Sequence, residues 1–215
     1  MSTSQPPANP ADPTPTAASS SAATKDDLRA CVSAARALMV PAEREVYARG
    51  LAGHLLAAAE IRDAESVAAY VAIGDEPGTS WVLDGLRRAG VRVLLPVLLD
   101  DNDLDWAAYD GAEALAEGRY GLREPTGRRL GVDAVSEVDA VLLPGLAASS
   151  RGLRLGRGGG SYDRALTRVP YGTFTCVLLY DGETGRDVPR EPHDRAVEAV
   201  VTPSGLTRLR PLPAG

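Results

Sequence analysis

A run of glycines between an apolar strand and a short helix constrains this chain more than any other feature of its sequence. Residues 138–143 read Val-Asp-Ala-Val-Leu-Leu, which is typical of a central strand in a parallel sheet, and residues 144–145, Pro-Gly, end it. Four glycines follow within residues 156–160, so the backbone there can adopt a positive φ and come close to a ligand. Ser161 is predicted to cap a helix over residues 162–168, whose free N–H groups favour an anion. The stretch therefore predicts a phosphate-binding loop.

Charged residues around the glycines support a phosphate site, but an alternative interpretation of the loop stays open. Neither common phosphate motif fits, because the dinucleotide pattern requires glycine at Ser161 and the P-loop pattern requires a Gly-Lys-Ser/Thr end. A tight turn without a ligand would also be rich in glycine. Arg154, Arg157 and Arg164 nevertheless supply fixed cationic donors. Asp163 lies where a magnesium-bound phosphate is expected, although an acid in a first helical turn also complements the helix dipole.

The segments around this loop predict an alternation of helices and strands. Thr24 and Thr79 are typical helix caps, and Pro41 is typical of a first helical residue. Continuous apolar runs are typical of buried strands. The expected helices cover residues 24–38, 41–60 and 80–89, and the expected strands cover residues 66–73, 91–97, 138–143, 173–180 and 196–202. This order predicts a three-layer α/β/α domain with a mainly parallel, Rossmann-like sheet.

Composition and charge narrow the function classes. The chain has 215 residues, of which 44% are hydrophobic and 24% charged, as expected for a single domain over residues 24–215. A net charge of −6 argues against a nucleic-acid-binding protein, because such proteins usually carry a basic face. The sequence contains no run of about 18 apolar residues, so no membrane-spanning helix is expected. Residues 1–23 are rich in Pro, Ala, Ser and Thr and predict a disordered tail without signal-peptide features. We therefore expect a cytoplasmic protein, and a monomer.

Two residue types are informative because they are rare. Cys31 and Cys176 lie far apart, on an expected helix and an expected strand, which favours buried reduced thiols over a disulfide or a metal site. Lys25 is the only lysine, beside 22 arginines, and a site that requires a compact ammonium group would explain it. A solvated helix start is the alternative interpretation of Lys25.

Four motifs in the loop region resemble the signature of the 5-formyltetrahydrofolate cyclo-ligase family, also called 5,10-methenyltetrahydrofolate synthetases. The motifs are Pro144-Gly-Leu-Ala147, Gly152-Leu-Arg-Leu-Gly156, Gly158-Gly-Gly160 and Tyr162-Asp-Arg164, and their spacing matches throughout. Residues 104–109 and 120–125 resemble the family's short strand and its Gly-x-x-Glu-Pro turn. The chain departs from the family at residues 148–149, which are Ala-Ser where Phe-Asp is usual, and at Ser161, which replaces an aromatic residue.

The resemblance implies a site for ATP, a reduced folate and magnesium. Lys25 and Arg29 match a Lys-x-x-x-Arg pair that contacts ATP, and Glu76 matches a substrate-binding glutamate. The residues assigned to ATP are Lys25, Arg29, Arg154, Leu155, Gly156, Arg157, Gly158, Gly159, Gly160, Ser161 and Tyr162, and those assigned to the folate are Val71, Glu76 and Tyr162. Arg154, Tyr162 and Asp163 form the expected catalytic set. Asp163 and Asp194 are the expected magnesium ligands, although Asp194 would serve equally as the cap of a turn.

The implied activity is the ATP- and Mg²⁺-dependent cyclisation of 5-formyltetrahydrofolate to 5,10-methenyltetrahydrofolate, with small molecules as the only expected partners. One alternative is a folate- or nucleotide-binding homologue without turnover, because of the departures at Ala148, Ser149 and Ser161. Another is a protein that shares only the fold, as sugar-phosphate isomerases and coenzyme A transferases do. In that case Glu76 or Glu124 would have to act as a base or a nucleophile.

We predict that deletion of residues 1–23 leaves turnover and the melting temperature nearly unchanged, because a polar, proline-rich segment has no apolar face to dock. Thermal unfolding and rate measurements on the shortened and full-length chains check this. A clear drop in the melting temperature would show that the tail contributes to the fold.

Overall fold

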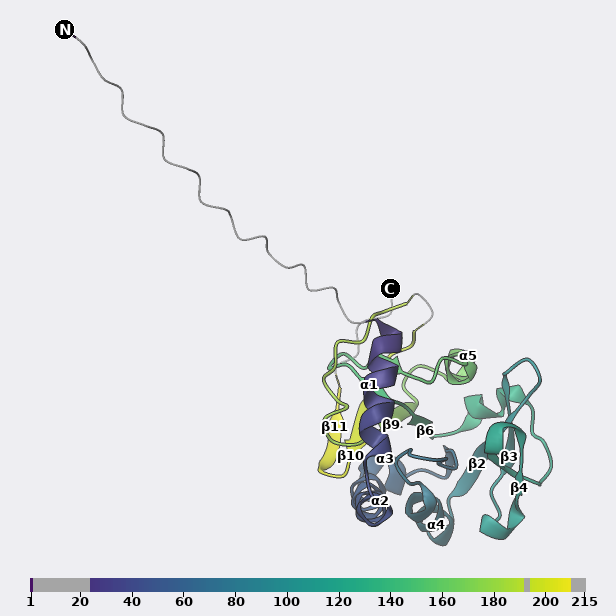
Figure 1. The fold of residues 1–215 in the computed structure, drawn as a ribbon. Coiled ribbons are helices and arrows are strands. Elements are labelled where there is room, and N and C mark those ends of the chain that lie inside the picture. The colour runs from purple at the N-terminus through teal and green to yellow at the C-terminus, as the bar shows by residue number, and fades with distance from the viewer. Residues whose placement is uncertain (2–23, 192–193, 210–215) are drawn as a thin grey trace.

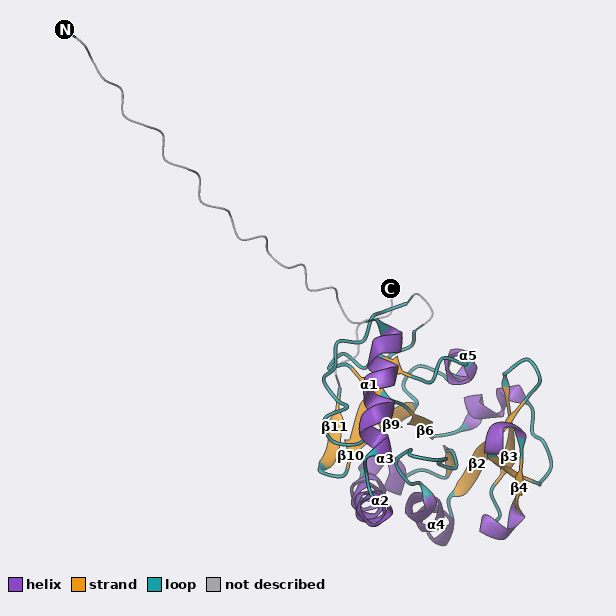
Figure 2. Ribbon diagram, viewed as in Figure 1, coloured by secondary structure: helices purple, strands orange, loops and turns teal. Residues whose placement is uncertain are grey.

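The chain forms a central sheet with helices on both faces. The computed structural model describes Met1, residues 24–191 and residues 194–209. In this part of the chain one seven-stranded sheet lies between layers of helices (Figures 1 and 2). The predicted three-layer α/β/α fold is therefore confirmed. The expected tail lies outside the described residues, apart from Met1.

The elements have the following bounds. The helices are α1 (Lys25–Ala37), α2 (Pro41–Leu56), α3 (Ala59–Arg62), α4 (Ser80–Arg88) and α5 (Ser161–Arg168), with short 3-10 turns η1 (Ala112–Ala114), η2 (Arg119–Gly121) and η3 (Val132–Glu137). The large sheet consists of β1 (Ser66–Ala68), β2 (Arg92–Leu98), β3 (Leu104–Ala108), β6 (Ala140–Pro144), β9 (Phe174–Leu178), β10 (Ala199–Thr202) and β11 (Gly205–Arg208). Two small sheets pair β4 (Leu115–Glu117) with β5 (Arg123–Pro125) and β7 (Ala147–Ala148) with β8 (Arg154–Leu155). None of the described helices is long and apolar enough to cross a membrane.

The order of the strands creates a crevice at one edge of the sheet. The order is β11-β10-β9-β6-β1-β2-β3, in which the strands from β10 to β2 are parallel and β3 and β11 pair antiparallel at the edges. The chain passes from β1 to β2 on one side and later enters β6 on the other side of β1. The connections after β1 and β6 therefore leave in opposite directions. A crevice at such a point is where open α/β sheets usually bind ligands.

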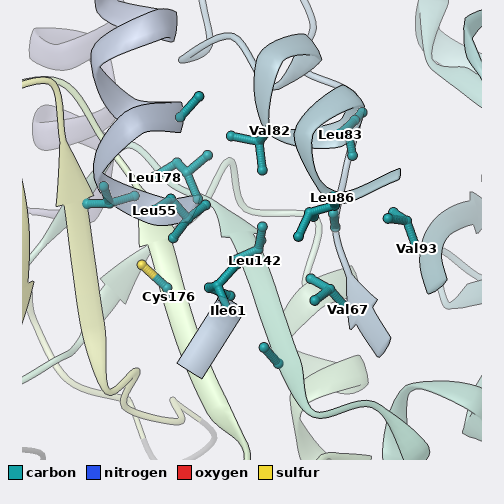
Figure 3. Packing of buried hydrophobic residues seen from close by; sticks show 14 of the residues in the cluster. Leu55, Ile61, Val67, Val82, Leu83, Leu86, Val93, Leu142, Cys176 and Leu178 are labelled. Atoms are coloured by element: carbon teal, nitrogen blue, oxygen red, sulfur yellow. The ribbon is translucent and has the colours of Figure 1, made fainter. Parts of the chain in front are cut away.

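Alternate residues of the central strands pack on opposite faces of the sheet. Leu142 and Cys176 belong to the cluster that α2, α3 and α4 cover, whereas their neighbours Val141 and Val177 belong to the cluster under α5. Figure 3 shows the first cluster, with helix residues Leu55, Val82, Leu83 and Leu86 beside strand residues Val67, Leu142, Cys176 and Leu178. Both faces of these strands are buried, which explains their continuous apolar sequence.

Strand β1 is shorter than its sequence predicts. The apolar run predicted a strand over residues 66–73, but β1 has three residues. The N–H of Ala72 donates to Thr79 Oγ1 and that of Ile73 to Glu76 Oε2, each at 3.0 Å, so turn side chains satisfy these donors instead of a neighbouring strand. Thr79 is the N-cap residue of α4, as predicted, but its hydroxyl accepts from Ala72 and makes no cap hydrogen bond to the helix.

The predicted helix bounds lie within one residue of the observed bounds, except at the end of the second helix. Thr24 forms a capping box with Asp27 at the start of α1, and Pro41 is the first residue of α2, as predicted. The predicted second helix to residue 60 is instead two helices, since α2 ends at Leu56 and α3 follows. The last predicted strand begins at residue 199 instead of 196, and the edge strand β11 follows without having been predicted.

The two cysteines are free thiols in different surroundings. Cys176 is buried in β9, as predicted, and its burial raises the pKa of the thiol. Cys31 is exposed on α1, so the prediction of a second buried thiol is wrong.

One buried ion pair fixes α1 to the loops at the carboxyl end of the sheet. Arg36 has no exposed surface, and its Nε and Nη2 each donate to a carboxylate oxygen of Glu183 at 2.8 Å. Nη2 also donates to the carbonyl of Gly145 at 2.7 Å, and Glu183 Oε2 accepts from the N–H of Tyr180 at 2.9 Å. Helix α1 is therefore held to the segments that follow β6 and β9.

We predict that Arg36→Met destabilises the protein by about 3–5 kcal/mol, because it leaves the buried Glu183 carboxylate without its cation. Glu183→Gln in the same chain should recover part of the loss, since a neutral amide costs less to bury. Thermal unfolding measures both variants.

The control is Arg208→Met, which breaks an exposed ion pair with Glu60 and should change the melting temperature little. Similar losses in the Arg36 and Arg208 variants would contradict the special role of the buried pair.

Candidate active site

A cleft lies at the carboxyl ends of β1, β2 and β6. The space between its walls is about 990 Å³, a figure that includes the open solvent at its mouth. Its walls consist of Tyr70, Val71, Ile73 and Glu76 after β1, of Pro96, Leu98, Leu104, Leu122, Arg123 and Glu124, and of Pro144, Gly145, Arg154 and residues 156–163. The structure thus brings together the glycine loop, Glu76 and Tyr162, as predicted.

The glycine loop has a backbone conformation that other residues rarely adopt. The angle φ is +100° at Gly158 and +71° at Gly160, and Gly160 is the N-cap of α5. Ser161 is therefore the first residue of the helix and makes no cap hydrogen bond, which corrects the prediction that it caps α5. Gly160 and Ser161 both line the cleft, so the N–H groups at the start of α5 are placed to bind an anion.

Arg154 supplies a buried cation behind this loop. Its side chain is 4% exposed, and it donates from Nη1 to the carbonyl of Pro144 at 3.0 Å and from Nη2 to Asp163 Oδ1 at 2.6 Å. A Cβ at Gly156 would lie 2.8 Å from Nη1, so glycine makes space for the guanidinium there. The guanidinium also lies 5.9 Å from the centre of the Tyr162 ring. The Nε of Arg154 makes no hydrogen bond within the described part of the chain.

The two predicted magnesium ligands have different surroundings. Asp163 lines the cleft and is 28% exposed, and the hydrogen bond to Arg154 uses only its Oδ1. Asp194 is not among the residues that line the cleft, and it accepts from Lys25 Nζ at 3.0 Å and from the N–H of Glu191 at 2.8 Å. No group of three or more His, Cys, Asp and Glu side chains among the described residues could hold a metal ion. A cation at Asp163 would therefore need oxygen atoms from a ligand or from water.

Three predicted ATP contacts, Lys25, Arg29 and Leu155, are not among the residues that line the cleft. Arg29 reaches the glycine loop, because its Nε donates to the carbonyl of Gly156 at 3.0 Å. Leu155 is buried in a small apolar cluster between α1 and the β7–β8 hairpin.

Lys25 is not a solvated residue at a helix start. Its Nζ forms ion pairs with Glu191 at 2.8 Å and with Asp194 at 3.0 Å. Burial alone would lower the pKa of Lys25, but the hydrogen bonds to the two carboxylates outweigh burial and raise the pKa. Lys25 therefore carries a full charge at neutral pH and ties the start of α1 to residues 191–194.

The wall that follows β1 is largely apolar and includes the buried Tyr70, and the half-buried Tyr162 of α5 lies at the same cleft. Tyr162, from α5, packs against both large core clusters. Burial, and then the charge of Glu76, raises the pKa of the Tyr162 hydroxyl, so this residue is a neutral hydrogen-bond donor at physiological pH. Burial likewise raises the pKa of Tyr70, whose hydroxyl makes no hydrogen bond to a described residue.

Glu76 is the charged residue of this wall, and its side chain is only 8% exposed. Its Oε1 accepts from Arg157 Nε at 3.0 Å, and its backbone carbonyl accepts from the Tyr180 hydroxyl at 3.2 Å. The neighbouring Asp75 accepts from Arg157 Nη2 at 3.2 Å. Arg157 thus joins the glycine loop to the turn after β1.

In the third wall of the cleft, which β2, β5 and the turn before β5 provide, Glu124 was the one residue that the sequence indicated for the site. Pro96 and Leu98 lie in β2 beyond its pairing with β1, while Leu122 and Arg123 come from the small β4–β5 sheet and its turn. Pro96, inside the apolar run of β2, could have indicated that the neighbouring strand ends there. Proline has no N–H, so it is tolerated where no neighbouring strand accepts a hydrogen bond, and β1 has ended at this point.

Comparisons with known proteins point to one family. A model of the 5-formyltetrahydrofolate cyclo-ligase family matches residues 21–203. A 5-formyltetrahydrofolate cyclo-ligase of Mycolicibacterium smegmatis is 37% identical over 193 residues, covering 87% of this chain and 98% of that protein. One of Escherichia coli is 30% identical over 172 residues, covering 79% and 94%. The NMR structure of Aquifex aeolicus 5,10-methenyltetrahydrofolate synthetase superposes with a TM-score of 0.75 at 26% identity, covering 89% of this chain and 95% of that one.

We predict that Gly160→Ala weakens anion binding at the loop, whereas Gly172→Ala does not. Both glycines have a positive φ, +71° and +92°, which costs an alanine about 1–2 kcal/mol of stability. Only at Gly160 would the new Cβ also meet a side chain, Arg164 Nη1 at 2.9 Å. Thermal unfolding with and without inorganic triphosphate measures both effects. Equal stabilisation of the two variants by triphosphate would contradict an anion site at the start of α5.

Proposed function

The chain belongs to the 5-formyltetrahydrofolate cyclo-ligase family, and on this premise we propose that it cyclises 5-formyltetrahydrofolate to 5,10-methenyltetrahydrofolate at the cost of ATP. The products of ATP in this reaction are ADP and phosphate. We propose further that the enzyme acts as a monomer in the cytoplasm.

One observation supports this activity above the others: a single cleft joins a cationic glycine loop to an apolar wall that contains a buried carboxylate. A nucleotide requires the first wall, because phosphates bind backbone N–H groups and guanidinium groups. A flat heterocycle with polar edges requires the second wall. The reaction needs both ligands side by side.

On the nucleotide side, we assign the phosphates to the N–H groups of residues 156–160 and to Arg154 and Arg157. Arg29 supports this assignment through its hydrogen bond to Gly156. Lys25 is assigned to ATP from the family pattern, since its present contacts are with Glu191 and Asp194. On the folate side, we assign apolar contact to Val71 and Tyr162 and hydrogen bonding to Glu76.

The chemistry explains why the protein needs no nucleophile of its own. The formyl oxygen attacks the γ-phosphorus of ATP, so a P–O bond forms and ADP leaves. The nitrogen N10 then attacks the formyl carbon, a C–N bond forms, N10 loses its proton, and the C–O bond breaks to release phosphate. Arg154 is buried and held by Pro144 and Asp163, so it is placed in advance to stabilise negative charge on the phosphoryl group.

Asp163 fits the requirements of a magnesium ligand. Magnesium in nucleotide sites is bound by one or two carboxylates together with phosphate and water oxygens, and Asp163 Oδ2 is not used by the contact with Arg154. When bound, the ion would neutralise charge on the phosphates. Asp194 would have to exchange its contact with Lys25 to take part.

A homologue without turnover is the alternative, and the surroundings of Ser149 argue against it. The Ser149 hydroxyl accepts from the N–H groups of Arg151 and Leu153 at 3.3 and 3.1 Å, so the turn between β7 and β8 is formed without the usual acid. The deciding experiment mixes the protein with 5-formyltetrahydrofolate and MgATP and follows the near-ultraviolet absorbance of the methenyl product. Binding of ATP without any ATP-dependent absorbance change would favour the alternative.

We predict that Asp163→Asn lowers the turnover rate by about two orders of magnitude or more, because the amide lacks the charge that the hard cation needs. The melting temperature without ligand should fall modestly, because the amide keeps an oxygen for Arg154 but removes the charge beside that buried cation, and the stabilisation by MgATP should shrink. Rates against magnesium concentration and melting curves of the free protein measure this. A variant that is less stable but turns over at nearly the normal rate would show that Asp163 only complements the helix dipole.

A further inference from the structure

We propose that Asp75 is a positioning residue for the reaction, which acts through Arg157 and makes the binding of ATP and of the folate mutually favourable. This inference rests on the proposed function, because it takes Arg157 as an ATP contact and Glu76 as a folate contact. The observation behind it is a pair of ion contacts that crosses from one wall of the cleft to the other.

The crossing contacts come from one guanidinium. Arg157 donates from Nε to Glu76 at 3.0 Å and from Nη2 to Asp75 at 3.2 Å. Arg157 belongs to the glycine loop, whereas the two acids belong to the turn after β1, and both Arg157 and Glu76 line the cleft. The Arg157 side chain is 52% exposed and Glu76 only 8%, so the cation reaches from the mouth of the cleft toward a buried carboxylate.

Each ligand competes with these contacts. A triphosphate that takes Arg157 removes the cation from Glu76 and leaves a buried charge unpaired. A folate that takes Glu76 in turn displaces the Arg157 guanidinium. The first ligand to bind therefore bears the free-energy cost of separating Arg157 from Glu76, and the second ligand finds them already separated. Each ligand should then raise the affinity for the other by the same factor.

Asp75 strengthens this contact without contacting either proposed ligand. It is not among the residues that line the cleft, yet it holds Nη2 and so orients Nε toward Glu76. Loss of its charge should weaken the hold of the turn on Arg157 while Arg157 and Glu76 both remain. Asp75 is thus the position at which the coupling can be changed without removing a ligand contact.

The test measures affinities by calorimetry, with 5-formyltetrahydrofolate and a non-hydrolysable ATP analogue plus Mg²⁺, each alone and in the presence of the other. In the unmodified protein we expect each ligand to tighten the other by about 5–20-fold. In Asp75→Asn each ligand alone should bind more tightly, and the coupling factor should fall by about two- to fivefold, the range for one partly exposed ion pair.

The control is Asp63→Asn, which breaks another arginine contact, with Arg62 Nε at 3.0 Å, outside the cleft. Its coupling factor should equal that of the unmodified protein. If Asp75 only stabilises the turn, Asp75→Asn will lower the melting temperature and leave the coupling factor unchanged, which overturns the proposal. Ligands that both bind but without coupling would overturn it as well, with the proposed function intact. Failure to bind the folate at all would overturn the proposed function and this inference together.

Discussion

Arg36 extends from α1 into the core and is wholly buried. The positions of the segments that form the cleft depend on the contacts of its guanidinium. Its guanidinium contacts Glu183 and the carbonyl of Gly145, and it lies 5.4 Å from the centre of the Tyr180 ring. The Tyr180 hydroxyl in turn donates to the carbonyl of Glu76. One cation thus connects the segments that follow β6, β9 and β1. Because β1 ends early, strand pairing does not hold the turn that follows it, and these contacts link that turn to α1.

The parts of the fold that were predicted correctly depend on local patterns. Thr24 and Pro41 mark helix starts through their own backbone chemistry, and the strands around Leu142 and Val177 are apolar because both of their faces are buried. The end of β1 was not predictable in this way, since it depends on Thr79 and Glu76 capturing backbone donors. Arg36 resembles any helical surface arginine, although it follows the buried Val32 by four residues, which places it on the same helix face.

The residues of the candidate site likewise fall into those that a local pattern marks and those that only the fold brings together. Residues 156–163 are contiguous, so a motif could identify them together, and all of them line the cleft. Leu104 and Leu122 enter the site only because distant segments pack beside it, and no local pattern marks them as ligand contacts. The contact between Arg157 and Glu76 joins residues 81 positions apart. The sequence shows two charged residues there, and only the fold shows that they meet.

The unpaired polar atoms at the cleft have a consequence for the evolution of this chain. Within the described residues, Arg154 Nε and the Tyr70 hydroxyl are buried without a hydrogen bond. A buried donor left unpaired costs about 1–3 kcal/mol, so selection for stability alone would favour Phe at residue 70, whereas Arg154 also pairs with Asp163. A screen of random variants for heat resistance should therefore collect substitutions at the cleft. Heat-resistant variants with such substitutions should turn over more slowly, because the replaced groups line the proposed site.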